Sequence, residues 1–378
     1  MRVLNVVSVL SAREGGGNAE RTAQLSRALA GIDVECTVLT LDIGDPSGRL
    51  HQLGGARLVV LPCINRRFQV PSTMPSTLVG LVRNADVIHL MGYWSFLGAA
   101  VARIAEREGV PYVISPAGAL PLFGRSRWLK RVFNVVVGQH LVKRAAGWVA
   151  VTASELPDFQ RYGIDPGKVE VIPNGVDEAD FADDPNASAS MATLPADPFV
   201  LFMGRLNRIK GPDLLLDAFI RVAPDFPKVK LVFAGPDEGL AGALRERATA
   251  AGLADRVHLI GFVSGCAKTA AYRAASLLVV PSRLEAMSIV AVEAGVCATP
   301  VLMTDQCGLD DVREVAPCLV VPVSVDALAS GLKAALSDLA VLKRWGTAWQ
   351  SIVRDRFLWA DIGGRFRDYL WSLSRKDQ

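Results

Sequence analysis

Two carboxylates, Glu285 and Glu293, stand in the otherwise small and apolar segment SRLEAMSIVAVEAGVCATP at positions 282–300. Such surroundings are unfavourable for a carboxylate unless hydrogen-bond donors or cations hold it. The preceding run Leu277–Val280 is typical of a strand, and a helix is predicted to begin near Ser288. On that helix Glu293 lies roughly 7–8 Å along the axis from Ser288. This spacing suits two carboxylates that accept hydrogen bonds from a sugar and from a ribose, with a phosphate between them.

A helix beginning near Ser288 would also create an anion site between the two carboxylates. The backbone N–H groups of Met287, Ser288, Ile289 and Val290 would lie in or just before its first turn, where they lack helical acceptors and the helix dipole favours negative charge. Spacing alone leaves an alternative open, in which the two glutamates are unrelated structural side chains that cap helices or form salt bridges.

Two cations follow another predicted strand, in the segment FMGRLNRIKGP at positions 202–212. The strand ends at Met203, and Pro212 suits the first turn of a following helix. Arg205 offers a planar fork of donors and Lys210 a mobile point charge, so together they could clamp a diphosphate. The alternative is two solvated loop cations, which are common on protein surfaces.

Glycines gather in a third segment, REGGGNAERTAQL at positions 13–25, between a predicted strand and a predicted helix. Gly16 and Gly17 would let the backbone approach a phosphate closely. The segment does not match the dinucleotide-binding pattern G-x-G-x-x-G, because Glu20 occupies the position of the third glycine. This mismatch disfavours a dehydrogenase, and a plain strand-to-helix turn remains the alternative.

The composition limits the remaining classes. A chain of 378 residues is too long for one ordinary core and fits two domains. With 41 basic and 38 acidic residues the net charge is +3, which is too balanced to predict nucleic-acid binding. The six cysteines form no C-x-x-C pair, the four histidines are dispersed, and no D-x-D occurs. We therefore expect reduced thiols, no metal site and no cofactor.

Short β-branched runs alternate with helical patterns, which predicts parallel α/β sheets covered on both faces. The predicted strands are Val3–Leu10, Val34–Leu41, Arg57–Leu61, Asp86–Met91, Tyr112–Ser115, Trp148–Thr152, Val169–Ile172, Phe199–Met203, Val229–Ala234, Val257–Ile260, Leu277–Val280, Val301–Met303 and Leu319–Val321. A linker rich in Asp, Ala, Ser and Pro at 181–197 separates an N-terminal domain at 1–180 from a C-terminal domain at 198–350 and a terminal helical segment at 351–378. Ligands of such sheets bind at the carboxyl ends of the strands, here in a cleft between the domains.

Six segments of the chain together resemble glycosyltransferase family 4, a family of retaining enzymes with the GT-B architecture. They are GGGNAER at 15–21, VIPNGVD at 171–177, MGRLNRIKG at 203–211, FAGP at 233–236, LIGFV at 259–263 and VVPSRLEAMSIVAVEAGVCATPVL at 279–302. The E-x7-E block is the most specific of them, and the R-x4-K pair precedes it as in the family. The resemblance implies an α/β fold of two Rossmann-like domains, with a C-terminal helix that crosses back to the N-terminal domain.

The resemblance also implies a role for each residue singled out above. Arg205 and Lys210 bind the donor diphosphate, and Glu285 contacts the donor sugar. The backbone at 288–290 contacts a phosphate, and Glu293 contacts the ribose. The other residues expected to surround the donor are Met287, Gly16, Gly17 and, near the nucleotide base, Gly235, Phe262 and Val263.

Two departures from the family pattern stand out. The family usually has Gly-Phe-Gly after the first glutamate, whereas this chain has Ala286-Met287-Ser288, so its added side chains could change which sugar fits. The family often has a histidine in the loop after the fifth strand, where this chain reads SPAGAL with Ala117 and Gly118. His89, at the end of the fourth strand, is a candidate substitute on the acceptor side, and a histidine at the edge of the core is the alternative.

On this resemblance we expect a retaining glycosyltransferase that uses a UDP- or GDP-linked sugar in bacterial surface-polysaccharide synthesis. The acceptor would be a saccharide or a polyprenyl-diphosphate-linked saccharide. It would attack from the front face, and the departing phosphate oxygen would take its proton without a covalent intermediate. Two alternatives stay open: a hydrolysing sugar-nucleotide epimerase and a non-catalytic sugar-nucleotide-binding protein.

The segment GRSRWLKRVFNVVVGQHLVKRA at 124–145 has the pattern of an amphipathic helix. Its apolar face comprises Trp128, Leu129, Val132, Phe133 and Val136, and Arg127, Lys130 and Arg131 lie opposite. Such a helix can bind an anionic membrane surface, or it can be a domain helix with a core face and a solvated basic face. The N-terminus and the apolar run at 90–102 predict neither a signal peptide nor a membrane-spanning helix. We expect a cytoplasmic protein with peripheral contact to the inner face of the cytoplasmic membrane.

Overall fold

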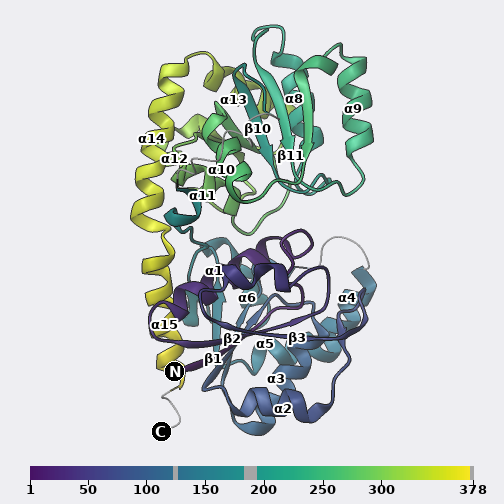
Figure 1. Ribbon diagram of the computed structural model, residues 1–378, viewed down its shortest axis with the longest axis vertical. Coiled ribbons are helices and arrows are strands. Elements are labelled where there is room, and N and C mark those ends of the chain that lie inside the picture. The colour runs from purple at the N-terminus through teal and green to yellow at the C-terminus, as the bar shows by residue number, and fades with distance from the viewer. Residues whose placement is uncertain (122–126, 183–193, 375–378) are drawn as a thin grey trace. The chain divides into compact units, whose positions relative to one another are not determined.

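The computed structural model describes residues 1–121, 127–182 and 194–374. The chain divides into two compact α/β units (Figure 1). Unit 1 comprises Met1–Gly175 together with Trp359–Gln378, and unit 2 comprises Val176–Leu358.

Unit 1 is built on a seven-stranded parallel sheet in the order β3-β2-β1-β6-β7-β8-β9. The strands are β1 (Arg2–Val6), β2 (Glu35–Leu41), β3 (Arg57–Leu61), β6 (Val87–Met91), β7 (Tyr112–Ser115), β8 (Gly147–Ala150) and β9 (Val169–Val171). A short antiparallel hairpin, β4 (Cys63–Asn65) and β5 (Val70–Pro71), follows β3. The strand order reverses between β1 and β6, which is where open parallel sheets bind ligands.

Helices cover both faces of this sheet, as the apolar strands predict. Residues that follow one another in β1 enter different cores: Val3 packs with α1 (Gly16–Ala30), and Leu4 packs with α2 (Pro75–Arg83) and α3 (Phe96–Glu108). On the side of Leu4 the chain also forms α4 (Arg127–Phe133), the π-helical η2 (Asn134–Gly138), α5 (Gln139–Lys143) and α6 (Leu156–Arg161).

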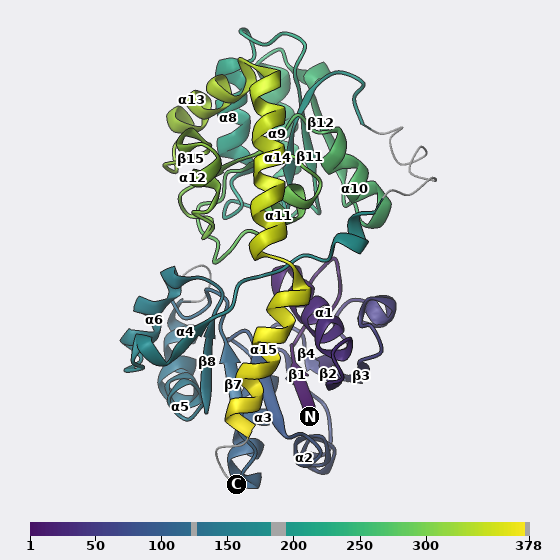
Figure 2. The ribbon, with the colours of Figure 1, turned by 90° about the vertical axis from the view of Figure 1, so that its left-hand side faces the viewer.

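The last helix, α15 (Trp359–Ser374), packs on unit 1 beside α1 (Figure 2). Its residues Trp359, Ile362, Phe366 and Leu370 are buried in the same core as Val3. The Tyr369 hydroxyl accepts a 2.9 Å hydrogen bond from the backbone N–H of Trp148 in β8. The predicted return of the C-terminal helix to the N-terminal domain is therefore confirmed.

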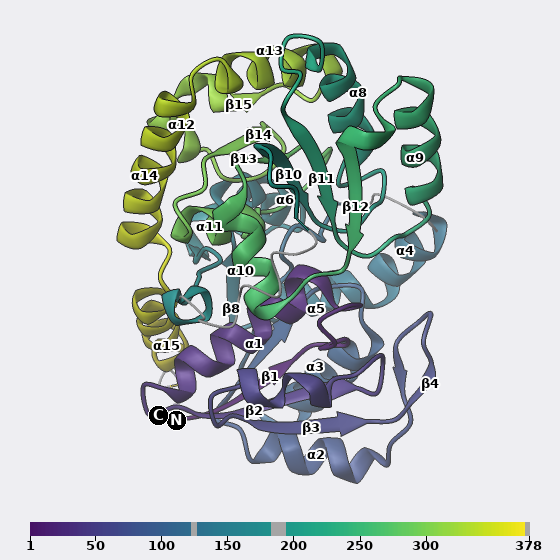
Figure 3. The ribbon, with the colours of Figure 1, turned by 45° about the horizontal axis from the view of Figure 1, so that its top comes forward.

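Unit 2 is built on a six-stranded parallel sheet in the order β12-β11-β10-β13-β14-β15 (Figure 3). The strands are β10 (Phe199–Met203), β11 (Lys230–Ala234), β12 (Val257–Gly261), β13 (Leu277–Val280), β14 (Val301–Thr304) and β15 (Val320–Val321). The helices are α8 (Pro212–Val222), α9 (Ala241–Ala250), α10 (Gly265–Ala274), α11 (Ile289–Val296), α12 (Val312–Val315), α13 (Val325–Leu336) and α14 (Leu339–Arg356). The order reverses between β10 and β13, so the loops after these neighbouring strands meet at one edge.

The borders of the units differ from the sequence expectation at both ends. Unit 2 begins at Val176, before the predicted boundary at 180, because Phe181 is buried and its carbonyl accepts a 2.6 Å hydrogen bond from Arg273. It ends at Leu358, after the predicted boundary at 350, because the buried Trp349 of α14 donates to the carbonyl of Ala291 in α11 at 2.8 Å. Most of the predicted linker, 183–193, lies outside the described residues.

The predicted parallel α/β architecture is confirmed, and β3, β7, β10 and β13 have the predicted bounds. β1 ends at Val6, whereas the predicted strand continues to Leu10. Leu10 is fully buried, but it lies in the loop that follows the strand. The β4–β5 hairpin was not predicted because it is very short and its Ile64 is exposed. Within the part of the chain that the structure describes, no helix combines the length and the hydropathy needed to cross a bilayer.

We predict that Phe366→Ala destabilises unit 1 selectively. Phe366 is fully buried and stacks edge-on against His89 at 4.8 Å between ring centroids, so its removal leaves a cavity. The free energy of unfolding of unit 1 should fall by about 3–5 kcal/mol. Hydrogen exchange resolved by peptide should then accelerate in β1 and β6 and stay unchanged in β10 and β13. The exposed neighbour Asp368→Ala should change neither set, and equal acceleration in both units would contradict the assignment of α15 to unit 1.

Candidate functional site

Two loops at the carboxyl edge of the unit 2 sheet form the candidate site. The first, residues 204–211, follows β10, and the second, residues 281–288, follows the neighbouring β13. Arg283 of the second loop fastens them together: its backbone N–H donates to the Ile209 carbonyl at 2.7 Å, and its guanidinium binds Asp213 at 2.7 and 2.8 Å. Burial raises the pKa of Asp213, but the hydrogen bonds and charge of Arg283 outweigh it, so the pKa is lowered and the carboxylate stays ionised.

Lys210 and Glu285, predicted separately, meet in an ion pair between these loops. The distance from Lys210 Nζ to Glu285 Oε1 is 2.6 Å, and the Ser282 hydroxyl donates to Glu285 Oε2 at 2.9 Å. The side chain of Lys210 is 25% exposed and that of Glu285 13%. Lys210 and Glu285 therefore neutralise each other at a site that solvent still reaches. The pair supplies the cation that the sequence analysis expects beside Glu285.

Arg205 is also paired, with a carboxylate that the sequence analysis missed. Its guanidinium lies 3.1 Å from Glu238 Oε1, and the Asn207 amide donates to Glu238 Oε2 at 2.7 Å. Glu238 lies in the loop after β11, the strand on the other side of β10. Both side chains of this pair are 41% exposed, so the pairing is weak and a more highly charged anion can replace Glu238.

The start of α11 lies where the sequence predicts an anion site. Ser288 is the N-cap residue, and its side-chain oxygen is buried without a hydrogen-bond partner. One predicted donor is not free, because the Ser288 N–H donates to the Cys307 carbonyl at 3.0 Å. The first-turn N–H groups of Ile289 and Val290 have no acceptor within the helix. The Met287 side chain is buried, so it packs inward instead of lining an open surface.

A third loop, 305–309 after β14, supports the second one from behind. The backbone N–H of Glu285 donates to the Gln306 carbonyl at 2.9 Å. Gly308 has φ +61°, and a Cβ there would lie 1.7 Å from the carbonyl oxygen of Ala286. This close approach therefore requires glycine.

Glu293 is buried in α11 and both of its carboxylate oxygens have donors. Lys268 Nζ of α10 lies 2.7 Å from Oε1, and the Tyr272 hydroxyl donates to Oε2 at 2.7 Å. The contact of Glu293 with a ribose stays a prediction. A ribose would have to use the remaining lone pairs of the carboxylate or displace Lys268.

The residues predicted near the nucleotide base lie at the same edge of the sheet. Gly235 follows β11, and a Cβ at this glycine would lie 1.9 Å from the carbonyl oxygen of Gly204. Phe262 and Val263 follow β12, and the Phe262 ring is 44% exposed. An exposed aromatic ring beside tightly packed glycine backbone can stack on a planar base.

In unit 1 the glycine segment forms the start of α1. The helix begins at Gly16, inside the predicted glycine segment, so Gly16 and Gly17 lie in its first turn. The described residues place no acidic side chain in that turn. The N–H groups there point out of the helix, which suits an anion.

His89 has the geometry of a core histidine, which corrects its candidacy on the acceptor side. It is 1% exposed, and its ring nitrogens lie 3.1 Å from Asn5 Oδ1 and 2.8 Å from Ser115 Oγ. Burial, followed by the charge of Arg21, lowers the pKa of His89 to about 3, so the ring is neutral at physiological pH. With both nitrogens occupied, the side chain has no group to offer a substrate.

The loop of Ala117 and Gly118 is held by a buried carboxylate that the sequence analysis did not single out. Both residues have positive φ, +49° and +76°. Glu155 accepts the N–H of Gly118 at 2.6 Å and that of Val151 at 2.8 Å. Burial raises the pKa of Glu155, and these backbone hydrogen bonds offset part of the rise. The N–H of Gly118 is thus committed to Glu155, while Ala117 presents only a strained backbone.

Among the described residues, no three His, Cys, Asp or Glu side chains lie close enough together to hold a metal ion. At this edge of the unit 2 sheet, Arg205, Lys210 and the N-terminus of α11 are positive groups that suit a diphosphate.

Comparison with known proteins identifies the family of the chain. A family model described as "Glycosyl transferases group 1" matches residues 185–351, and one described as "Glycosyl transferase 4-like domain" matches residues 16–175. The chain is 34% identical over 332 residues to a D-inositol 3-phosphate glycosyltransferase of Segniliparus rotundus, covering 82% of this chain and 73% of that protein. It is also 34% identical over 347 residues to a D-inositol 3-phosphate glycosyltransferase of Xylanimonas cellulosilytica. That match covers 80% of this chain and 79% of that protein.

A solved structure shares the complete fold. The crystal structure of Anabaena HepE in complex with UDP-glucose superimposes with a TM-score of 0.80 at 20% identity, covering 98% of this chain and 100% of that one. The two-sheet architecture is thus that of the GT-B fold. From the family models, the relatives and the fold together, the chain belongs to glycosyltransferase family 4.

Proposed function

We propose that this chain transfers a sugar, with retention of configuration, from a UDP- or GDP-linked donor to a saccharide or a lipid-linked saccharide. The observation that carries the proposal is the pairing of Lys210 with Glu285 at the edge of the unit 2 sheet, beside Arg205 and the α11 N-terminus. Cations and free helix-end N–H groups suit a diphosphate, and a carboxylate suits sugar hydroxyls. That HepE binds UDP-glucose supports a nucleotide-sugar donor.

The ion pairs suggest how a donor would organise the site. A diphosphate carries more charge than one carboxylate, so it would take Lys210 from Glu285 and Arg205 from Glu238. Glu285, once released, could accept hydrogen bonds from the donor sugar. Lys210 and Arg205 would then stabilise the charge that develops on the departing diphosphate.

The chemical step needs no protein nucleophile. The acceptor oxygen forms a bond to the anomeric carbon on the face from which the diphosphate leaves. The bond between that carbon and the phosphate oxygen breaks, and the phosphate oxygen takes the proton of the acceptor hydroxyl. The nucleoside diphosphate is the leaving product.

A panel of UDP- and GDP-sugars, each offered with and without acceptor, tests the proposal. Release of nucleoside diphosphate only in the presence of acceptor is expected. Release without acceptor would favour the hydrolysing epimerase, and donor binding without turnover for any acceptor would favour the non-catalytic binding protein.

A second acceptor class has its own support. Relatives at 34% identity are named D-inositol 3-phosphate glycosyltransferases, which makes a phosphorylated cyclitol a candidate acceptor. Competition between D-inositol 3-phosphate and a polyprenyl-diphosphate-linked saccharide for one labelled donor separates the two classes. Labelled product formed with one acceptor alone identifies the class.

Lys210→Ala should lower kcat by more than about a hundredfold, because it removes a point charge from the leaving diphosphate. Steady-state kinetics with circular dichroism checks both turnover and folding. The matched control is Lys333→Ala, which breaks a surface pair with Asp225 elsewhere in unit 2 and should keep wild-type kcat. Near-wild-type turnover of Lys210→Ala would remove this lysine from the mechanism.

Glu285→Ala should reduce transfer to a similar extent, since it removes the proposed partner of the sugar hydroxyls. The exposed Glu246→Ala on α9 is the control and should be neutral. An unchanged rate in the Glu285 variant would show that another group recognises the sugar.

We further propose that unit 1 contacts an anionic membrane surface through the helix 127–143. Three side chains of its predicted apolar face are exposed: Trp128 (67%), Val132 (53%) and Val136 (71%). The neighbouring Val135 is 72% exposed. Residues 124–126 of the predicted segment lie outside the described residues. Leu129 and Phe133 of the same predicted face are partly buried, and Phe133 packs against Trp94 and Phe96. The side chains that stay exposed are the ones that could enter a membrane surface.

Replacing Trp128 and Val132 together by serine should weaken sedimentation with phosphatidylglycerol vesicles at low salt by at least about tenfold, because two apolar side chains no longer enter the bilayer. Leu50→Ser, an exposed leucine elsewhere in unit 1, is the control and should leave sedimentation unchanged. If the wild-type protein does not sediment with these vesicles, the membrane contact is wrong.

A further inference from the structure

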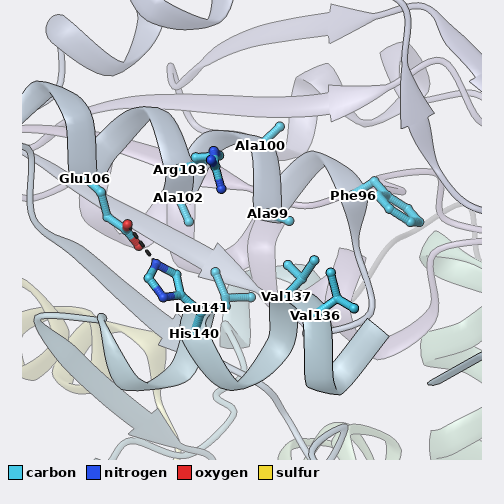
Figure 4. A pocket seen from close by; sticks show the side chains of 10 residues that line it. All are labelled: Phe96, Ala99, Ala100, Ala102, Arg103, Glu106, Val136, Val137, His140 and Leu141. Carbon is cyan, nitrogen blue, oxygen red and sulfur yellow. Dashed lines mark hydrogen bonds and ion pairs between the residues drawn. The ribbon is translucent and has the colours of Figure 1, made fainter. Parts of the chain in front are cut away.

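A groove of about 420 Å³ lies in unit 1 between α3 and the helix formed by η2 and α5 (Figure 4). It falls within the size range of small-molecule binding pockets. From α3 it is lined by Phe96, Ala99, Ala100, Ala102, Arg103 and Glu106, and from the opposite helix by Val136, Val137, His140 and Leu141. Nothing in the proposed transfer reaction uses this groove.

The groove exists because α3 carries small side chains where it faces the other helix. Ala99, Ala100 and Ala102 fill little space, and Leu141 closes the floor. The opposite wall contains the π-helical turn η2, which places Val136 and Val137 on the groove. The interior is therefore a continuous apolar channel between two helices.

The two ends of the groove differ in chemistry, as Figure 4 shows. At one end lie Phe96 and Val136, both exposed. At the other end the Glu106 carboxylate and His140 Nε2 meet at 2.9 Å across the groove, with the exposed Arg103 nearby on α3. A ligand that fits must be apolar along most of its length and polar at one end.

Charge around the groove favours an anionic head group. The sequence from Arg127 to Arg144 contains no acidic residue, and Arg131, Lys143 and Arg144 are exposed. The apolar end adjoins the exposed Val132 and Val135 of the same helix. An anionic lipid could thus place one chain in the apolar channel while its head group meets Arg103, Lys143 and Arg144 at the polar end.

We propose that the groove binds one hydrocarbon chain of an anionic membrane phospholipid. This inference rests on the membrane contact proposed above and deepens it, because it adds a defined lipid site to a general apolar surface. The bound chain would hold the helix 127–143 in a fixed place relative to the bilayer, while the transfer chemistry stays in unit 2.

The test uses the full-length chain with 1-oleoyl-lysophosphatidylglycerol as monomers below its critical micelle concentration. Calorimetry should find one bound lysolipid per chain. Ala99→Phe, which fills the channel, should weaken this binding at least tenfold, and Ala99→Ser, which leaves it open, should bind within about twofold of wild type. Neutral 1-oleoyl-lysophosphatidylcholine should bind more weakly than the anionic lipid.

The outcomes separate the groove from the general membrane contact. If the wild type sediments with phosphatidylglycerol vesicles but binds no lysolipid monomer, or if Ala99→Phe binds it as well as wild type, the groove proposal is overturned and the surface contact stands. If the monomer binds but vesicles do not, the membrane contact fails, and the assignment of the occupant to a membrane phospholipid fails with it. Equal affinity for the neutral lysolipid would contradict the anionic assignment.

Discussion

The ion pair between Lys210 and Glu285 is the interaction on which the rest of the site depends. It joins the loop after β10 to the loop after β13, and it keeps a cation and a carboxylate ready without leaving either one unpaired. The side chain of Glu285 is only 13% exposed, and a carboxylate with so little access to solvent needs a cation or hydrogen-bond donors to hold its charge. The pair therefore keeps both charged groups together between the two loops.

The fold makes this pairing possible because neighbouring parallel strands end at the same edge. β10 and β13 pair directly, so the loops that carry Lys210 and Glu285, which are 75 residues apart in sequence, come into contact. Arg283 and the glycine at 308 then fix the geometry, the first by bridging the loops and the second by allowing the third loop to pack closely. The position of each residue in the candidate site thus follows from which strands are neighbours in the unit 2 sheet.

Much of this could be predicted from the sequence because the informative features are local. The buried strands can be recognised in the sequence as apolar runs. Such a run precedes each of Arg205, Lys210, Glu285 and the start of α11. The partners of Arg205 and Glu293 could not be predicted, because Glu238, Lys268 and Tyr272 come from other segments and carry no local signal that ties them to the site. His89 shows the same limit, since its hydrogen bonds to Asn5 and Ser115 from neighbouring strands decide that it is structural.

Units 1 and 2 differ in the chemistry of their surfaces. Unit 2 concentrates charge at a sheet edge, whereas unit 1 exposes an apolar and basic helix next to an amphipathic groove. The central claim, that a donor diphosphate replaces Glu285 as the partner of Lys210, is tested most directly by a crystal structure with a bound nucleotide-sugar. The account predicts Lys210 Nζ within hydrogen-bond distance of a phosphate oxygen and the Glu285 carboxylate on a sugar hydroxyl. An intact Lys210–Glu285 pair, with the nucleotide bound elsewhere, would contradict it.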